Sequence, residues 1–146
     1  MRVAIVVQRY GEEVVGGAES HARTLAGRLR GDLGWQVEVF TTTALDYRSW
    51  ANHYAPGRTL VDGIPVWRFD SSAPRRLLLS GACRRLAGPA ARSRPAPLLE
   101  SLWLRLQGPY SPRLLDAIRR HAARFDRVLF FSYLYHPTVR GVELVG

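Results

Sequence analysis

The feature that most constrains this chain is a glycine pair, Gly16 and Gly17, between a short apolar strand and an amphipathic helix. Residues 2–7 have the apolar character of a strand, and residues 18–30 repeat apolar side chains at helical spacing. Glycines at the start of a helix let a ligand approach the backbone and leave the first helical N–H groups free to face an anion. The sequence therefore predicts a phosphate- or sugar-binding loop in an α/β domain.

The rest of the chain continues this alternation of strands and helices. Asp62-Gly63 between two β-type runs predicts a β-hairpin, and Ser111-Pro112 predicts a helix that begins with an N-cap and a proline in its first turn. Further strands are expected over residues 36–41, 59–61, 64–69 and 127–132, and the last of these is apolar almost throughout, as in a parallel strand buried on both faces. Further helices are expected over residues 74–88, 98–106 and 112–124, with Leu102 on the apolar face of the second, and a linker is expected over residues 88–97. This order predicts a Rossmann-like, open, mainly parallel sheet with helices on both faces and a β-hairpin insertion.

Ligands of such sheets bind beyond the carboxyl ends of the strands, so two loops are candidate sites. The first loop, residues 9–19, contains the glycine pair, and the second, residues 132–137, follows the last expected strand. We expect these loops to face each other across one crevice. The candidate residues of its acceptor side are Glu19, His21, Ser132 and Tyr133. Two of them have simpler interpretations, since Glu19 can stabilise the helix N-terminus by its charge and His21 can be a packed residue.

The charge of the chain is strongly positive and unevenly distributed. The net charge is +9, and all 21 basic residues are arginines. Residues 71–99 contain six arginines, including Arg75, Arg76, Arg84 and Arg85, and no acidic residue. This patch is a candidate contact for an anionic membrane surface or for nucleic acid, or it is a solvated arginine-rich face. Nucleic acid is the less favoured partner because no ordered aromatic platform accompanies the arginines.

Several functional classes lack support in the sequence. A single cysteine, Cys83, excludes an internal disulfide and a cysteine-rich zinc site, and we expect no metal and no cofactor. Neither a G-x-G-x-x-G dinucleotide fingerprint nor a phosphate-binding G-x-x-x-x-G-K-[ST] loop is present. No signal peptide or membrane-spanning run is visible, so a cytoplasmic location is expected, with a peripheral contact at the inner face of the membrane as an addition.

Four segments together resemble a known family. They are Met1-Arg2-Val3-Ala4-Ile5-Val6-Val7, Gly16-Gly17-Ala18-Glu19-Ser20-His21, Gly34-Trp35-Gln36-Val37-Glu38-Val39-Phe40-Thr41-Thr42 and Asp62-Gly63-Ile64-Pro65-Val66. This pattern resembles the N-terminal, acceptor-side domain of group 1 (family 4) retaining glycosyltransferases, which have the GT-B fold of two Rossmann-like domains. The resemblance implies that Gly16 and Gly17 reach the donor diphosphate or sugar. It also implies that His136 corresponds to a histidine near the transferred sugar and is a candidate catalytic residue.

The resemblance sets the functional expectation. Residues 1–146 are expected to be one domain, truncated at its C-terminal end, of a retaining glycosyltransferase. The enzyme would move a sugar from a nucleotide-diphosphate sugar to a glycan or lipid-linked acceptor. In that family the nucleotide contacts and a paired-glutamate motif belong to the C-terminal domain, so this part alone is expected to be inactive. The alternative is a non-catalytic basic binding module for nucleic acid or an anionic membrane surface.

Overall fold

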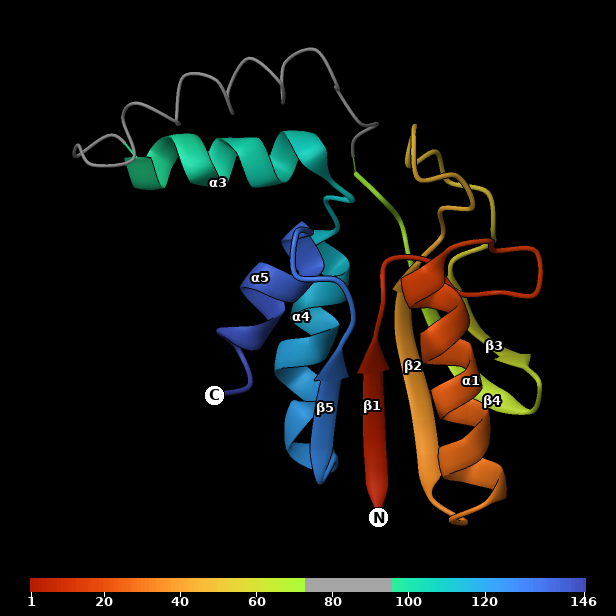
Figure 1. The fold of residues 1–146 in the computed structure, drawn as a ribbon. Coiled ribbons are helices and arrows are strands. Elements are labelled where there is room, and N and C mark those ends of the chain that lie inside the picture. Colours follow the sequence, from red (N-terminus) through yellow and green to blue (C-terminus); the bar gives the residue numbers. More distant parts are fainter. Residues whose placement is uncertain (73–95) are drawn as a thin grey trace.

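The computed structural model describes residues 1–72 and 96–146, which form a mixed α/β fold around one five-stranded sheet (Figure 1). The strand order is β3-β4-β2-β1-β5, and only β3 runs antiparallel to its neighbour. The strands are β1 (Arg2–Val6), β2 (Gln36–Thr42), β3 (Gly57–Val61), β4 (Ile64–Phe69) and β5 (Arg127–Phe130). The mostly parallel sheet is compatible with the Rossmann-like fold predicted from the sequence.

Helices cover both faces of the sheet, as predicted. The helices of the described residues are α1 (Gly17–Gly31), α3 (Ala96–Gln107), α4 (Pro112–His121) and α5 (His136–Val142), with a short 3-10 turn at Ala122–Arg124, and α3 lies beyond the end of the sheet (Figure 1). On one face, Ala22, Ala26 and Leu29 of α1 pack on alternate residues of β1 and β2. On the other face, Leu114, Ala117 and Ile118 of α4 pack on the opposite set. Burial of both faces explains why β1 is apolar at each position from Val3 to Val6.

Two local predictions are confirmed by the geometry of the chain. Asp62 and Gly63 both have positive φ, 52° and 72°, as a two-residue hairpin turn requires, and β4 joins the main sheet beside β2. The N-cap prediction for α4 is also right, because the Ser111 hydroxyl accepts a hydrogen bond from the Leu114 N–H at 3.4 Å.

Three predictions need correction. The last strand was expected to be buried on both faces, but β5 lies at an edge of the sheet and is only partly buried. His136 and Pro137 were expected in a loop, but they begin α5, because proline is well accommodated in the first turn of a helix. In α3, Leu102 of the predicted apolar face is exposed, whereas Leu104 is 2% exposed.

The arginine-rich patch falls almost entirely outside the described residues. The predicted helix over residues 74–88, Cys83, and Arg75, Arg76, Arg84 and Arg85 all lie in residues 73–95. The helix predicted from residue 98 begins two residues earlier, at Ala96, and takes the last two residues of the predicted linker. Within residues 1–72 and 96–146, no helix combines the length and apolar character that a membrane crossing needs.

Candidate functional site

The candidate site lies where β1 and β5 end side by side. The chain leaves β1 toward β2 on one side, and β5 pairs with β1 on the other, so the sheet order reverses between these two strands. The N-terminus of α1 lies at the same end of the sheet as the carboxyl ends of both strands (Figure 1). Ligands of open α/β sheets bind at such a switch point.

Gln8, just after β1, connects the two strand ends. Its side chain is 1% exposed, and its Nε2 donates to the Phe131 carbonyl at 2.7 Å. The Gln8 carbonyl accepts a hydrogen bond from the Thr42 hydroxyl at 2.6 Å. One buried residue therefore holds the ends of β1, β2 and β5 in a fixed relation.

Arg9 fastens the glycine loop to α1. Its Nε and Nη2 donate to the same Glu19 oxygen at 2.9 and 2.7 Å, and both side chains are nearly buried, at 7% and 10% exposed. The guanidinium also donates to the carbonyls of Leu45 at 2.9 Å and Val15 at 3.2 Å. A buried charge is tolerated when it is paired and hydrogen-bonded, and this arginine is both. Glu19 is thus held by Arg9 inside the protein.

The two glycines have different surroundings. A Cβ at Gly16 would collide with the Glu19 carboxylate and would lie 2.9 Å from Arg9 Nη2. A Cβ at Gly17 would meet no atom within 4 Å. The absence of a side chain at Gly16 makes room for the ion pair of Arg9 with Glu19. No side chain caps α1 at Gly16, and the position of Gly17 borders open space, so the N-terminus of α1 is left open.

His21 of α1 lies against the end of β5. The His21 ring meets the Phe131 ring edge-on with centroids 5.5 Å apart. Ser132 follows with a φ of 65°, and Tyr133 is 79% exposed. Glu19 and His21 are two residues apart, so they leave α1 on roughly opposite sides. The structure therefore places His21 beside Phe131 at the end of β5, just before Ser132 and Tyr133, and Glu19 on the far side of α1.

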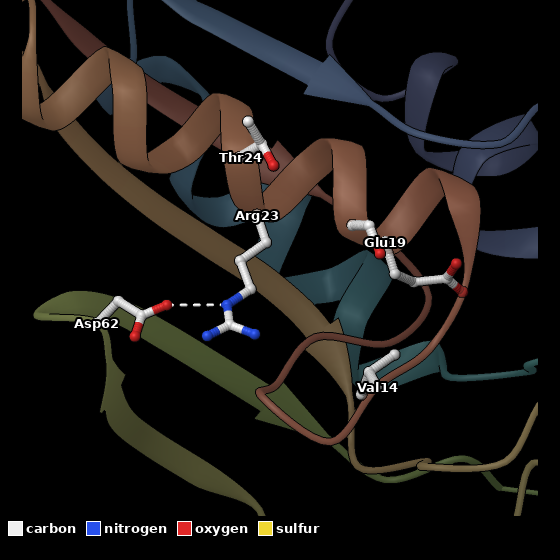
Figure 2. A pocket seen from close by; sticks show the side chains of 6 residues that line it. Val14, Glu19, Arg23, Thr24 and Asp62 are labelled. Carbon is white, nitrogen blue, oxygen red and sulfur yellow. Dashed lines mark hydrogen bonds and ion pairs between the residues drawn. The ribbon is translucent and has the colours of Figure 1, made fainter.

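A pocket of about 350 Å³ lies on that far side, between α1 and the turn of the β3–β4 hairpin. Figure 2 shows Glu19, Arg23 and Asp62 around it, with the Arg23 Nε donating to Asp62 at 2.8 Å. Val14, Ser20 and Thr24 complete the wall. Its carboxylates, hydroxyls and guanidinium are the groups that hydrogen-bond polyhydroxylated ligands.

Arg68, at the end of β4, is a residue of the site that no sequence pattern indicated. It is 4% exposed, its Nη2 donates to the Tyr10 carbonyl at 2.9 Å, and its guanidinium lies 4.2 Å from the centre of the Tyr54 ring. Its Nη1 is buried without a hydrogen-bond partner, and in the described part of the chain no carboxylate pairs with it. Burial lowers the pKa of Arg68. Through its hydrogen bond to Tyr10, Arg68 helps to hold the glycine loop in place.

His136, the candidate catalytic residue, is buried at the start of α5. It is 5% exposed, and its ring meets the Tyr110 ring edge-on at 4.8 Å. Thr138, two residues later, approaches Gln8 instead, with its hydroxyl 3.4 Å from Gln8 Nε2. Burial, followed by the charges of Arg140 and Arg105, lowers the pKa of His136 to about 4, so the ring is neutral at physiological pH.

Two further findings bear on identity. No group of three or more histidine, cysteine, aspartate or glutamate side chains in residues 1–72 and 96–146 is arranged to hold a metal ion. The chain has no significant match to any family model, any curated protein or any solved structure.

Proposed function

We propose that this chain is the acceptor-side part of a glycosyltransferase that uses a nucleotide-diphosphate sugar and a glycan or lipid-linked acceptor. The observation that carries the proposal is the uncapped N-terminus of α1 at the switch point of the sheet, where Gly17 borders open space. Helix N–H groups and the helix dipole favour an anion there. Sugar transfer requires such a group, because negative charge develops on the leaving diphosphate as the glycosidic bond breaks.

The surroundings of the glycine loop supply contacts for the sugars. The crevice side offers the His21 ring and the Ser132 and Tyr133 side chains, and the far side of α1 offers the pocket with Glu19 and Arg23. In this proposal the retaining transfer is completed by a second, donor-binding domain of the GT-B type. The acceptor hydroxyl must then be held on the same face of the sugar as the leaving group.

The rigidity of the loop supports the proposal. A diphosphate is stabilised best by donors that need no rearrangement when charge develops. The ion pair of Arg9 with Glu19 and the hydrogen bond of Arg68 to Tyr10 hold the loop from both sides. Preorganisation of this kind is what a site for a transition-state charge needs.

The experiment is a calorimetric titration of the protein with a panel of nucleoside diphosphate sugars at constant ionic strength. We expect Gly17→Ala to weaken binding about tenfold or more, since a methyl group there keeps the phosphate from the helix N–H groups. Gly27→Ala is the matched control, because Gly27 lies in the same helix and a Cβ there also meets no atom within 4 Å. It should bind like the parent protein.

Two outcomes would overturn the proposal. One is the absence of binding to every nucleoside diphosphate sugar. The other is equal affinity in the Gly17→Ala and Gly27→Ala proteins. Binding of duplex or single-stranded DNA that falls steeply with salt, together with no sugar-nucleotide binding, would favour the basic binding module instead.

A further inference from the structure

A second pocket, of about 320 Å³, lies between α3, α4 and α5. Arg105 of α3 and Arg140 of α5 line it together with the imidazole of His136, and Ser101 and Tyr110 add polar side chains. Its volume is at the lower end of the range of ligand pockets and suits a small molecule. This pocket and the one beside α1 share no lining residue.

The His136 ring has an unmet hydrogen-bonding need. His136 is 5% exposed, and its Nδ1 is buried and has no hydrogen-bond partner. A buried polar atom without a partner is destabilising by about 1–3 kcal/mol, and such atoms are rare in native proteins. His136 also lines the pocket, so its wall contains a ring with unsatisfied hydrogen-bonding capacity.

The charges around the pocket do not cancel. Arg140 donates to both oxygens of Glu143, at 3.0 and 3.2 Å. Arg105 lies over the Tyr110 ring, with its guanidinium carbon 5.4 Å from the ring centre, and has no carboxylate partner within the described residues. Two guanidinium groups and one carboxylate leave an excess positive charge beside a polar cavity. That charge favours an anion.

We propose that the pocket between α3, α4 and α5 binds the phosphate or carboxylate group of a small ligand, with Arg105 and Arg140 as its charge partners and His136 as a hydrogen-bond donor. Arginine presents several N–H donors in a planar fork, which matches the oxygens of either group. A bound anion also stabilises the protonated imidazole, so that both ring nitrogens donate. The proposal stands independently of sugar transfer, because it uses none of the residues of the glycine loop.

The test is a titration of the protein with inorganic phosphate at neutral pH and constant ionic strength, followed by NMR of the histidine ring resonances. We expect the His136 resonances to move from the neutral toward the protonated position on saturation. The other histidines, His21, His53 and His121, are internal controls that should not move in this way. A parallel titration with acetate distinguishes a phosphate site from a carboxylate site, and saturation by either ion supports the proposal.

A pair of arginine variants separates a built site from general charge attraction. Arg105→Gln should weaken the anion affinity about tenfold or more, since it removes a charged hydrogen-bond partner. Arg119→Gln removes one positive charge from the exposed surface of α4, outside the pocket, and should leave the affinity unchanged. The proposal is overturned if neither ion moves the His136 resonances, or if both variants weaken binding equally.

Discussion

The carboxyl ends of β1 and β5 lie side by side. The charged group that follows β1 is paired, whereas the groups near the end of β5 are not fully paired. Behind β1, the Arg9 guanidinium meets the Glu19 carboxylate and two backbone carbonyls. Behind β5, the buried His136 ring has an orphaned nitrogen, and Arg105 lies near it without a carboxylate partner among the described residues. A satisfied ion pair holds backbone in place, whereas an unsatisfied cluster has capacity left for a ligand.

This difference assigns distinct roles to the two regions. The Arg9–Glu19 pair is a positioning device, because it fixes the loop from which α1 begins. The open position is at Gly17, one residue beyond the pair. In the α3–α5 pocket, by contrast, the side chains themselves face the cavity. The variants below distinguish residues that position the glycine loop from residues that bind a ligand.

The largest expected effect is on the buried ion pair. Arg9→Met leaves the Glu19 carboxylate buried without its partner, and we expect the free energy of unfolding to fall by about 3–5 kcal/mol. Urea denaturation followed by tryptophan fluorescence measures this change. Adding Glu19→Gln should restore a large part of the loss, because the uncompensated charge is then gone. A double variant as unstable as Arg9→Met would contradict the role given to the pair.

A smaller effect separates the two glycines. Gly16→Ala places a methyl group against the Glu19 carboxylate and Arg9, and we expect a loss of about 1–3 kcal/mol from overpacking. Gly17→Ala places one in open space, so its unfolding free energy should stay within about 1 kcal/mol of the parent or rise. Thermal or urea unfolding of the two variants checks this. Equal losses in both proteins would show that the two glycines do not differ as described.

A third effect concerns the pH dependence of stability around His136. The pKa of His136 is about 4 in the folded protein against the ordinary histidine value of 6.5. Below pH 6.5 the unfolded chain takes up a proton that the folded chain resists. The unfolding free energy therefore falls as the pH drops from 6.5 and levels off below about 4, with a slope of at most about 1.4 kcal/mol per pH unit.

His136→Gln should remove this part of the pH dependence, while His53→Gln, at an exposed position, should keep it. Chemical denaturation at a series of pH values gives the profiles. If the His136→Gln protein loses stability toward acid as steeply as the parent, His136 is not the group responsible. The comparison is most informative without phosphate, since a bound anion would raise the pKa of the ring.

The parts of the fold that follow from neighbouring residues could be predicted from the sequence. Asp62-Gly63 specifies a hairpin turn, and Ser111-Pro112 specifies a helix start, through backbone preferences that act within a few residues. The Rossmann-like order of elements follows from their alternation. The edge position of β5 was missed because burial depends on which strands lie beside it, and apolar sequence alone does not report that.

The contacts of the site were less predictable because they join residues far apart in the chain. Arg9 gave no local signal for its partner Glu19 or for Leu45, and Arg68 none for Tyr10. His136 was placed in a loop, although the proline after it was a readable signal for the first turn of a helix. The glycine pair was predicted to lie in a ligand-binding loop. The difference between Gly16, which makes room for the ion pair, and Gly17, which borders open space, follows only from the positions of Arg9 and Glu19.

The central claim is that the N-terminus of α1 is the binding site for a diphosphate. The most direct measurement is an NMR map of backbone amide shifts on titration with pyrophosphate and with nucleoside diphosphate sugars. The account predicts the largest shifts at Gly17, Ala18 and Glu19, with smaller shifts at Ser132 across the crevice, and their loss in Gly17→Ala. Shifts confined to the α3–α5 pocket, or no shifts at all, would contradict it.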